Sequence, residues 1–375
     1  MQLVEKQLLA LLKASLWESS VESSLFEEEV DWKTIIKLSK EQTVSGIVYD
    51  GMLTLPQKLR PSRIVLLQWT NILLQLENNN QLMNGELGKL FANYEANGVL
   101  PILMKGQGLA YNYPQPLHRQ CGDIDVYVGK SGFDKANKLL VSLGGKIINV
   151  SSRRALCKWN ILTVENHCKL TEFGSPWANC FLNKEMKQVC NSNRKVKIGE
   201  YDIRLLPLEL DVMFVLVHLL LHFIYEGIGL RQICDWACML HRYRDDIDKK
   251  ELERLLRGVG CYNGAKIVGA MMVKYLGFPK NELPFMISAE DYKNSEWLMG
   301  GIIEGGNFGF FSEYYKHKPK NWLKRKLYAV NNIINRCRKY HKLASAEAWC
   351  YPFRLVVIFL RIRLNRLMGR EEVEV

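Results

Sequence analysis

The sequence lacks the short motifs and long runs that mark several protein classes. Its ten cysteines include no CxxC pair, so neither a zinc ribbon nor a thiol redox motif is present. It contains no internal repeat and no low-complexity tract. With 48% apolar and 24% charged residues in a chain of 375, the composition is that of a globular protein with a substantial core.

No apolar run reaches the roughly 20 residues that cross a bilayer. The longest, residues 212–224, contains two histidines, His218 and His222. The first twenty residues resemble an amphipathic helix and lack the basic start, apolar block and cleavage site of a signal peptide. Scattered cysteines also fit a reducing compartment. Together these observations lead us to expect a cytoplasmic protein without a transmembrane segment.

Acidic residues are nearly absent from residues 316–370, which hold 15 Lys plus Arg and one acid, Glu347. That segment therefore carries +14, while the rest of the chain sums to about −2. The asymmetry predicts contact with a polyanion such as RNA, most strongly around Arg336, Arg338 and Lys339. The mixed basic and apolar residues 353–370 also fit a membrane-surface helix, and a solvated helical face is the third interpretation.

Hydrophobic periodicity divides the chain into three regions. Residues 1–97 and 207–375 show helical spacing, and residues 98–206 mix short strand-like runs with one helix between 131 and 145. We therefore predict an α+β fold with a mixed β-sheet core between N-terminal and C-terminal helical regions. The strand-like runs are residues 99–104, 122–128, 146–150, 158–170 and a hairpin within 195–206.

Two aspartates interrupt the apolar run "GDIDVYV". Side chains alternate across a strand, so Asp123 and Asp125 are expected on one face, with Ile124 on the other. Neighbouring carboxylates repel each other unless a cation lies between them, and oxygen ligands suit Mg²⁺. In "LTVENHCKL", Glu165 lies two residues before His167 and offers a third carboxylate from another strand. The pattern predicts a Mg²⁺ or Mn²⁺ site at Asp123, Asp125 and Glu165.

The order of these motifs resembles the DNA polymerase beta-type nucleotidyltransferase superfamily, and within it the bacterial uncharacterised nucleotidyltransferases. Their motifs are KG, then RxxGD[IL]D, then a carboxylate two residues before His. Here these are Lys105-Gly106, the block from Arg119 to Asp125, and Glu165-Asn-His167. The resemblance continues into "HLLLHFIYEGIGLRQICDWACML", so it covers most of the chain.

The resemblance implies an ATP- or other NTP-dependent transferase of that superfamily. Asp123, Asp125 and Glu165 would be both metal ligands and catalytic residues. The sequence departs from the usual motifs of the superfamily in two places. Lys105-Gly106-Gln107-Gly108 stands where the loop is commonly Gly followed by Ser or Gly, and the third acid is Glu rather than Asp. The nucleotide would contact residues of the motifs and of the following helices: Lys105, Gly106, Arg119, Gly122, His167, His222 and Arg231.

Other interpretations of these side chains stay open. Lys105 could be a surface charge, Arg119 could pair with an aspartate, and His167 could orient Glu165. His218 and His222 have the i,i+4 spacing of a zinc pair but no HExxH, which favours histidines at the edge of the core. Arg231 and Asp235, also four apart, predict an ion pair within a helix or a contact that closes a cleft.

The predicted reaction is transfer of a nucleoside monophosphate from an NTP to an acceptor, with release of pyrophosphate. The acceptor could be RNA, a protein side chain, a sugar or a small metabolite, because these residues do not select among them. Two alternatives belong to other classes: a catalytically silent nucleotide- or RNA-binding module of the same fold, and a peripheral membrane-surface protein.

Overall fold

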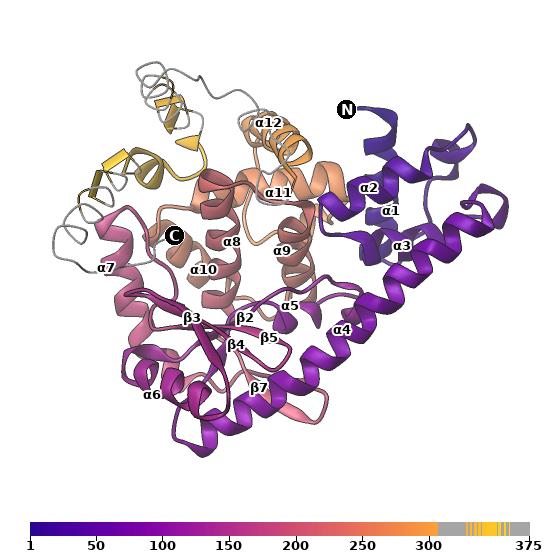
Figure 1. Cartoon of the computed structure of the whole chain (residues 1–375). Helices are drawn as coiled ribbons and strands as arrows, with labels where there is room; N and C mark the ends of the chain where they lie inside the picture. The colour runs from indigo at the N-terminus through magenta and orange to yellow at the C-terminus, as the bar shows by residue number, and fades with distance from the viewer. Residues whose placement is uncertain are drawn as a thin grey trace.

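The computed structural model describes residues 1–306, together with residues 328, 331, 334–335, 337–338, 340–350, 352–353, 356–357 and 360. Within these residues the fold is α+β, as predicted, with a mixed sheet between helical regions (Figure 1). Most of the basic segment 316–370 lies outside the described residues. This includes Arg336 and Lys339, two of the three residues that mark its densest part.

The central sheet has five strands in the order β1-β2-β5-β4-β3. Strands β2 and β5 are parallel, and every other pair in this sheet is antiparallel. Two further strands, β6 and β7, form the predicted hairpin, with Gly199 in its turn at φ 59°. The bounds are β1 Ile102–Leu103, β2 Ile124–Tyr127, β3 Lys146–Val150, β4 Arg154–Trp159, β5 Leu162–His167, β6 Lys195–Ile198 and β7 Tyr201–Arg204.

Two predicted strands differ from the structure. The run 99–104 yields only the two residues of β1, since Pro101 has no N–H to donate to a ladder. The run 158–170 is interrupted at Asn160, whose φ of 50° turns the chain between β4 and β5. The shortness of β1 and the turn between β4 and β5 therefore each follow from one residue, Pro101 and Asn160.

The N-terminal region is helical, as the periodicity predicts. Helix α4, Arg63–Ala96, is 34 residues long and runs from the N-terminal helices to the sheet (Figure 1). Its first half buries Trp69 and Leu73 among helices, and its last turns bury Leu87 and Phe91 against the sheet. The other elements are α1 Leu3–Leu16, η1 Ser23–Phe26, α2 Trp32–Glu41, α3 Ser45–Leu53 and η2 Gln57–Leu59.

The helices of the second half pack on the N-terminal helices in one core that is separate from the core beneath the sheet. Among the described residues, one helix, α8, Leu208–Tyr225, is long and apolar enough to cross a bilayer. Its 18-residue window is 72% buried inside the fold, as expected of a core helix. The other helices are α9 Leu230–Arg242, α10 Lys249–Gly258, α11 Tyr262–Leu276, η5 Lys280–Glu282 and α12 Ala289–Gly305.

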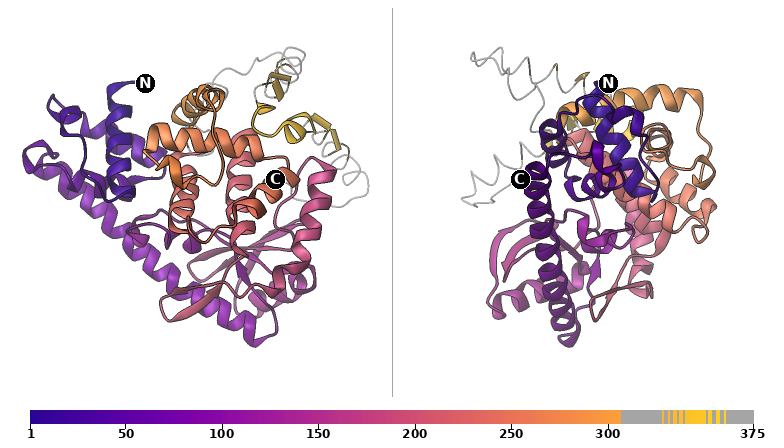
Figure 2. Two further views of the ribbon diagram at one scale, coloured as in Figure 1. Left: turned by 180° about the vertical axis from the view of Figure 1, so that it is seen from behind. Right: turned by 90° about the vertical axis from the view of Figure 1, so that its right-hand side faces the viewer.

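Besides the four-residue α5, Gln107–Ala110, the sheet region contains one helix that the sequence predicts, α6, Gly129–Ser142, and one that it does not, α7, Pro176–Glu185. The signal for α7 is nonetheless present, because Ser175 caps the helix and Pro176 occupies its first turn. Glu347, the one acid of the basic segment, accepts hydrogen bonds from the backbone N–H groups of Gly174 and Ser175. This carboxylate fixes the described part of the C-terminal segment beside the start of α7 (Figure 2).

A short η3 turn, Pro116–His118, packs directly on α3. A β-carbon at Gly46 would lie 2.3 Å from the carbonyl oxygen of His118, so only glycine allows this approach. Asn80 of α4 donates hydrogen bonds to the carbonyl oxygens of Leu117 (2.7 Å) and Arg119 (2.9 Å). Helices α3 and α4 therefore fix the loop that leads into β2.

Candidate active site

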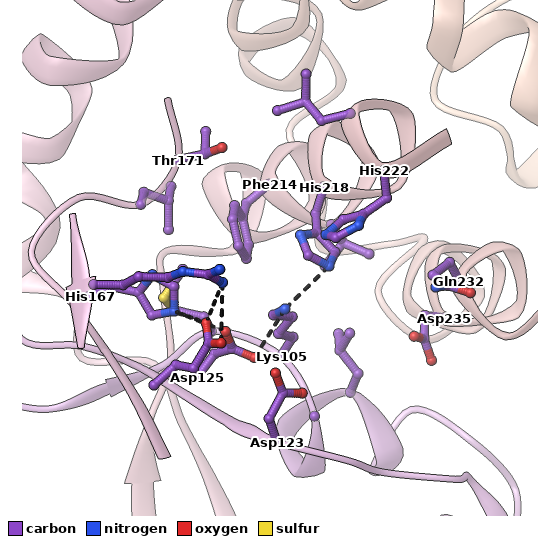
Figure 3. A pocket seen from close by; sticks show the side chains of 18 of the residues that line it. Lys105, Asp123, Asp125, His167, Thr171, Phe214, His218, His222, Gln232 and Asp235 are labelled. Atoms are coloured by element: carbon purple, nitrogen blue, oxygen red, sulfur yellow. Dashed lines mark hydrogen bonds and ion pairs between the residues drawn. The ribbon is translucent and has the colours of Figure 1, made fainter. Parts of the chain in front are cut away.

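A cavity of about 700 Å³ lies between the sheet and helices α8 and α9. Its volume is within the usual range for small-molecule sites. Figure 3 shows that His167 and Thr171 lie toward one end, Gln232 and Asp235 toward the other, and Lys105 with the aspartates between them. The cavity therefore has a sheet wall, from β1, β2, β4 and β5 with their loops, and a helical wall, from α8 and α9.

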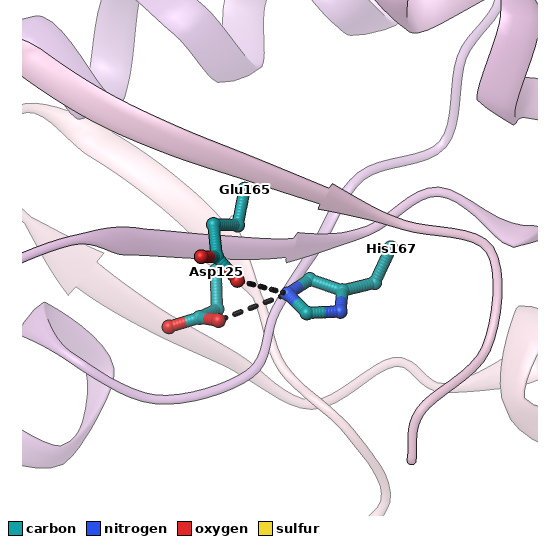
Figure 4. A group of neighbouring side chains, drawn as sticks. All are labelled: Asp125, Glu165 and His167. Atoms are coloured by element: carbon teal, nitrogen blue, oxygen red, sulfur yellow. Dashed lines mark hydrogen bonds and ion pairs between the residues drawn. The ribbon is translucent and has the colours of Figure 1, made fainter. Parts of the chain in front are cut away.

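The sheet wall presents two buried carboxylates side by side. Parallel pairing of β2 with β5 places Asp125 directly opposite Glu165, and their residues are 1% and 9% exposed. His167 Nε2 lies 2.9 Å from Asp125 Oδ1 and 3.4 Å from Glu165 Oε2 (Figure 4). Ligand atoms of these three residues all lie within 4.8 Å of one another.

Lys105 links the sheet wall to the helical wall. Its Nζ lies 3.0 Å from Asp125 Oδ2 and 3.2 Å from Nε2 of His218 on α8 (Figure 3). Burial and the Lys105 charge lower the pKa of His218 well below its usual value, so the imidazole is neutral and its Nε2 accepts from the ammonium. Lys105 is thus a partly buried cation, 20% exposed at its side chain, with an acid and a neutral histidine as partners.

Charge compensation keeps this cluster ionised. Burial alone would raise the pKa of Asp125, but Lys105 and His167 hold it far below its usual range. Burial would lower the pKa of His167, but its bonds to Asp125 and Glu165 raise it. The pKa of Glu165 is likewise lowered against burial, through His167 and through Arg154, whose Nη1 lies 2.9 Å from Glu165 Oε2. Carboxylates and cations therefore alternate along the sheet wall.

Asp123 lies outside strand β2, directly before it, and lines the cavity together with Asp125. The Asp125 charge and burial raise the pKa of Asp123, which shows that the two carboxylates are close enough to repel. Gly106 packs beside it: its φ is 63°, and a β-carbon there would lie 3.2 Å from the Asp123 carbonyl oxygen. Glycine is therefore required in the Lys105-Gly106 turn.

The donor set fits a divalent cation. Two carboxylates and one imidazole suit Mn²⁺, and the carboxylate oxygens alone suit Mg²⁺. The sequence predicts Asp123, Asp125 and Glu165 as ligands, whereas the tightest group in the structure is Asp125, Glu165 and His167. Asp123 lines the same cavity without belonging to that group.

The loop before β2 is fastened to the helical wall by a buried ion pair. Arg119 Nε and Nη2 lie 2.6 and 2.7 Å from the two carboxylate oxygens of Asp235 on α9. Tyr113 donates a further hydrogen bond of 2.7 Å to Asp235. The intrahelical pair expected between Arg231 and Asp235 is replaced by this contact, because Asp235 faces the loop. Arg119 lines the cavity while its guanidinium holds α9 in place.

The remaining predicted residues also line the cavity. Arg231 donates from Nη1 to the carbonyl oxygen of Gln120 at 2.8 Å, and burial together with Arg119 lowers its pKa. Gly122 leaves open space around its α-carbon. His222 Nδ1 lies 2.9 Å from Glu226, and its ring packs against His218 with centroids 4.2 Å apart. Among the described residues, the histidine pair belongs to no metal-binding group.

Sequence reasoning missed five charged residues of the cavity: Arg153, Arg154, Lys169, Glu172 and Glu226. Arg154 begins β4 and pairs in register with His167. The polar run "SSRR" does not predict a strand, although an arginine near a predicted carboxylate site is a candidate ion-pair partner. Lys169 follows His167 by two residues, on the loop that leaves the sheet toward α7.

Comparison with known proteins agrees with this geometry. The sequence profile of the family described as uncharacterised nucleotidyltransferase matches residues 28–277, which include both walls of the cavity. No curated protein and no solved structure matches the chain. Since the matched residues make up more than half of the sequence, the chain belongs to the uncharacterised nucleotidyltransferase family.

Proposed function

We propose that this protein transfers a nucleoside monophosphate from an NTP to an acceptor hydroxyl and releases pyrophosphate. The observation that carries the proposal is the pair of buried carboxylates, Asp125 and Glu165, placed opposite each other on adjacent strands inside a cavity of about 700 Å³. A purely structural pair of acids would have no reason to line a cavity of that size.

Asp125, Glu165 and His167 would hold the divalent cation, with Asp123 adding a carboxylate from the loop before β2. Bound there, Mg²⁺ or Mn²⁺ would supply positive charge for the reacting phosphate and the leaving pyrophosphate. Lys105 and Arg231 are cations of the chain that line the cavity together with Asp123. We assign them to the triphosphate, whose negative charge they would balance.

The reaction requires a group that accepts the proton of the attacking hydroxyl, and we assign this role to Glu165. Its carboxylate is ionised, because His167 and Arg154 hold its pKa below the usual value against burial. Phe214 and Tyr225 of α8 line the opposite wall and offer ring surfaces for the nucleobase. Aromatic surfaces of this kind do not by themselves select one base.

The decisive experiment incubates the full chain with each labelled NTP, Mg²⁺ or Mn²⁺, and pools of RNA, protein and small-molecule acceptors. Label should move to one pool, and the Asp125→Asn variant should not catalyse the transfer. Absence of transfer from every NTP, with NTP binding intact, would favour the nucleotide-binding module. That second function is favoured by one observation: Lys105, His167 and Arg154 already neutralise the carboxylates without a metal.

A further inference from the structure

We propose that the acceptor carries a phosphate group next to the hydroxyl that is modified, and that Arg154 and Lys169 bind this phosphate. The inference rests on the proposed nucleotidyl transfer and specifies the acceptor's chemistry. We call Arg154 and Lys169 the acceptor-side cations, and Lys105 and Arg231 the donor-side cations. Both pairs line the same cavity.

The two pairs belong to different parts of the cavity. Lys105, on the turn after β1, contacts Asp125 in the middle of the cavity, and Arg231 is on the first turn of α9, the helix whose Gln232 and Asp235 lie at one end (Figure 3). Arg154 and Lys169 lie beyond Glu165 and His167, at the end of the sheet where β4 begins and β5 ends. A triphosphate on the donor side leaves the second pair unused. A second anionic substrate would account for it.

Arg154 lies where an acceptor would approach Glu165. Its Nη1 contacts both Glu165 oxygens, at 2.9 and 3.1 Å, while its side chain is 41% exposed. Arg154 lines the cavity on the sheet wall, and Glu226, which directly follows α8, lines it on the helical wall. The Arg154 side chain is therefore accessible from the cavity. Its other N–H donors can hold a phosphate oxygen while the attacking hydroxyl lies against Glu165.

Lys169 extends the basic surface outward from Arg154. Its Nζ lies 3.1 Å from Glu172, with both side chains about one-third exposed, so this ion pair is weak and easily exchanged for phosphate. Arg153 also lines the cavity, and its Nε lies 3.3 Å from the same Glu172. This part of the cavity thus carries three cations, Arg153, Arg154 and Lys169, and two of them share Glu172 as their acid.

The basic C-terminal segment is anchored beside this surface. Glu347 accepts from the N–H groups of Gly174 and Ser175, and Tyr225 of the cavity donates to the same carboxylate. Gly174 follows Lys169 by five residues on one loop. The described residues around Glu347, in a segment whose sequence holds 15 basic residues, are therefore joined to the loop that carries Lys169 and to a residue of the cavity. Such continuity favours a nucleic-acid end over a small phosphorylated molecule as the source of the phosphate.

In the proposed step, the acceptor oxygen forms a bond to the α-phosphorus of the NTP. The bond between that phosphorus and the oxygen bridging to the β-phosphate breaks, and pyrophosphate leaves with the electron pair. The hydroxyl proton passes to the Glu165 carboxylate. The acceptor phosphate held by Arg154 and Lys169 is not changed, and it serves only to position the hydroxyl.

The test measures acceptor binding without catalysis. A fluorescein-labelled single-stranded RNA about 12 nucleotides long, with a free 3′-hydroxyl, is titrated with the full chain in Mg²⁺, and binding is followed by anisotropy. We compare wild type, Lys169→Gln, and Arg154→Gln combined with Lys169→Gln. The matched control combines Lys58→Gln with Lys197→Gln, which removes two exposed lysines outside the cavity. Binding of a fluorescent ATP analogue is measured on the same preparations.

We expect the double variant to bind RNA at least about tenfold more weakly, with Lys169→Gln alone intermediate and the control unchanged. The slope of log affinity against log salt should fall by about 0.7 for each phosphate that the variant no longer neutralises. Affinity for the ATP analogue should stay within about twofold, because the donor-side cations are intact. Circular dichroism of each variant checks that the fold is retained.

The other outcomes are equally informative. RNA could fail to bind while the ³¹P signal of inorganic phosphate broadens with wild type and not with the variant that lacks Arg154 and Lys169. The acceptor is then a small phosphorylated molecule, and the proposed phosphate site is supported. If neither probe responds to the substitutions, or if only the ATP analogue binds more weakly, the proposal is wrong. If the substitutions weaken RNA binding as expected but the protein binds no ATP analogue, the proposed nucleotidyl transfer is wrong.

Discussion

The sheet wall and the helical wall of the cavity contribute in different ways. The sheet wall supplies the carboxylates, placed by strand register, with Asp125 and Glu165 opposite each other. The helical wall supplies partners that fix charged groups of the first wall: His218 holds Lys105, and Asp235 holds Arg119. We therefore propose that metal binding and proton transfer depend on the sheet wall, while the helical wall aligns these groups and adds contacts to the nucleotide. Substitutions should separate the two, with activity lost on the sheet side and stability lost on the helical side.

The helical wall also depends on distant residues. Gln42, which directly follows α2, accepts from the backbone N–H of Leu230 at 3.0 Å and donates to the carbonyl oxygen of Ile302 at 3.1 Å. A β-carbon at Gly229 would lie 2.8 Å from the Gln42 carbonyl oxygen. The first turn of α9, which carries Arg231, is thus positioned by the N-terminal helices rather than by the sheet.

The largest expected effect is on the sheet wall. Asp125→Asn keeps the side-chain shape and removes the charge between Lys105 and His167, so NMP transfer should fall by about three orders of magnitude. Transfer is measured with labelled NTP and the acceptor pool identified as above. Asp134→Asn, an exposed change on α6, is the matched control. Unchanged transfer by Asp125→Asn would remove this residue from the active site.

The corresponding change on the helical wall should affect stability. Asp235→Ala leaves the Arg119 guanidinium buried without its carboxylate, so the free energy of unfolding should fall by about 3 kcal/mol. Urea unfolding measures it, with Asp245→Ala at an exposed position as control. Combining Arg119→Met with Asp235→Leu should recover most of the loss. A double variant as unstable as Asp235→Ala would show that the buried charge is not the cause.

Two glycine substitutions should have effects of opposite sign. At Gly46→Ala the new methyl group meets the His118 carbonyl oxygen at 2.3 Å, so we expect a loss of about 2 kcal/mol. At Gly85→Ala, inside α4, no atom lies within 4 Å, and the better helix former should add about 0.5–1 kcal/mol. Thermal and urea unfolding of both variants test whether the η3 turn must pack this closely on α3.

The smallest effect is a pH dependence at the same turn. His118 lies between Asp50 (2.7 Å) and Glu77 (2.7 Å), and although burial opposes protonation, both acids raise its pKa above 6.5. The contribution to stability is therefore fully present below pH 6.5 and is lost as the pH rises through the raised folded-state pKa. We expect about 1 kcal/mol or less. The unfolding free energies of wild type and His118→Asn are measured between about pH 5.5 and 8.5, and their difference gives the contribution of His118. A difference that does not change with pH would show that His118 is not the titrating group.

Sequence reasoning located the parts of the site that depend on local spacing. Period-two alternation predicted Asp123 and Asp125 on one strand, and the Glu-x-His spacing predicted Glu165 and His167 on another. The structure brings Asp125, Glu165 and His167 together, whereas Asp123 lies directly before β2 and outside this group. Sequence reasoning could not reach Lys105–His218 or Arg119–Asp235, because each pair joins segments more than 100 residues apart through helix packing. Parallel pairing of β2 with β5 is equally invisible in either strand alone.

Helix α4 has a mechanical consequence. At about 1.5 Å per residue its 34 residues form a rod about 50 Å long, whose two halves belong to different hydrophobic cores. Near its middle, Asn80 holds the carbonyl groups of the loop that enters β2. A movement that parts the sheet from the helical core must bend this rod or turn about its long axis. Because a sharp bend would break backbone hydrogen bonds, we expect rotation about α4 to be the motion of lower energy.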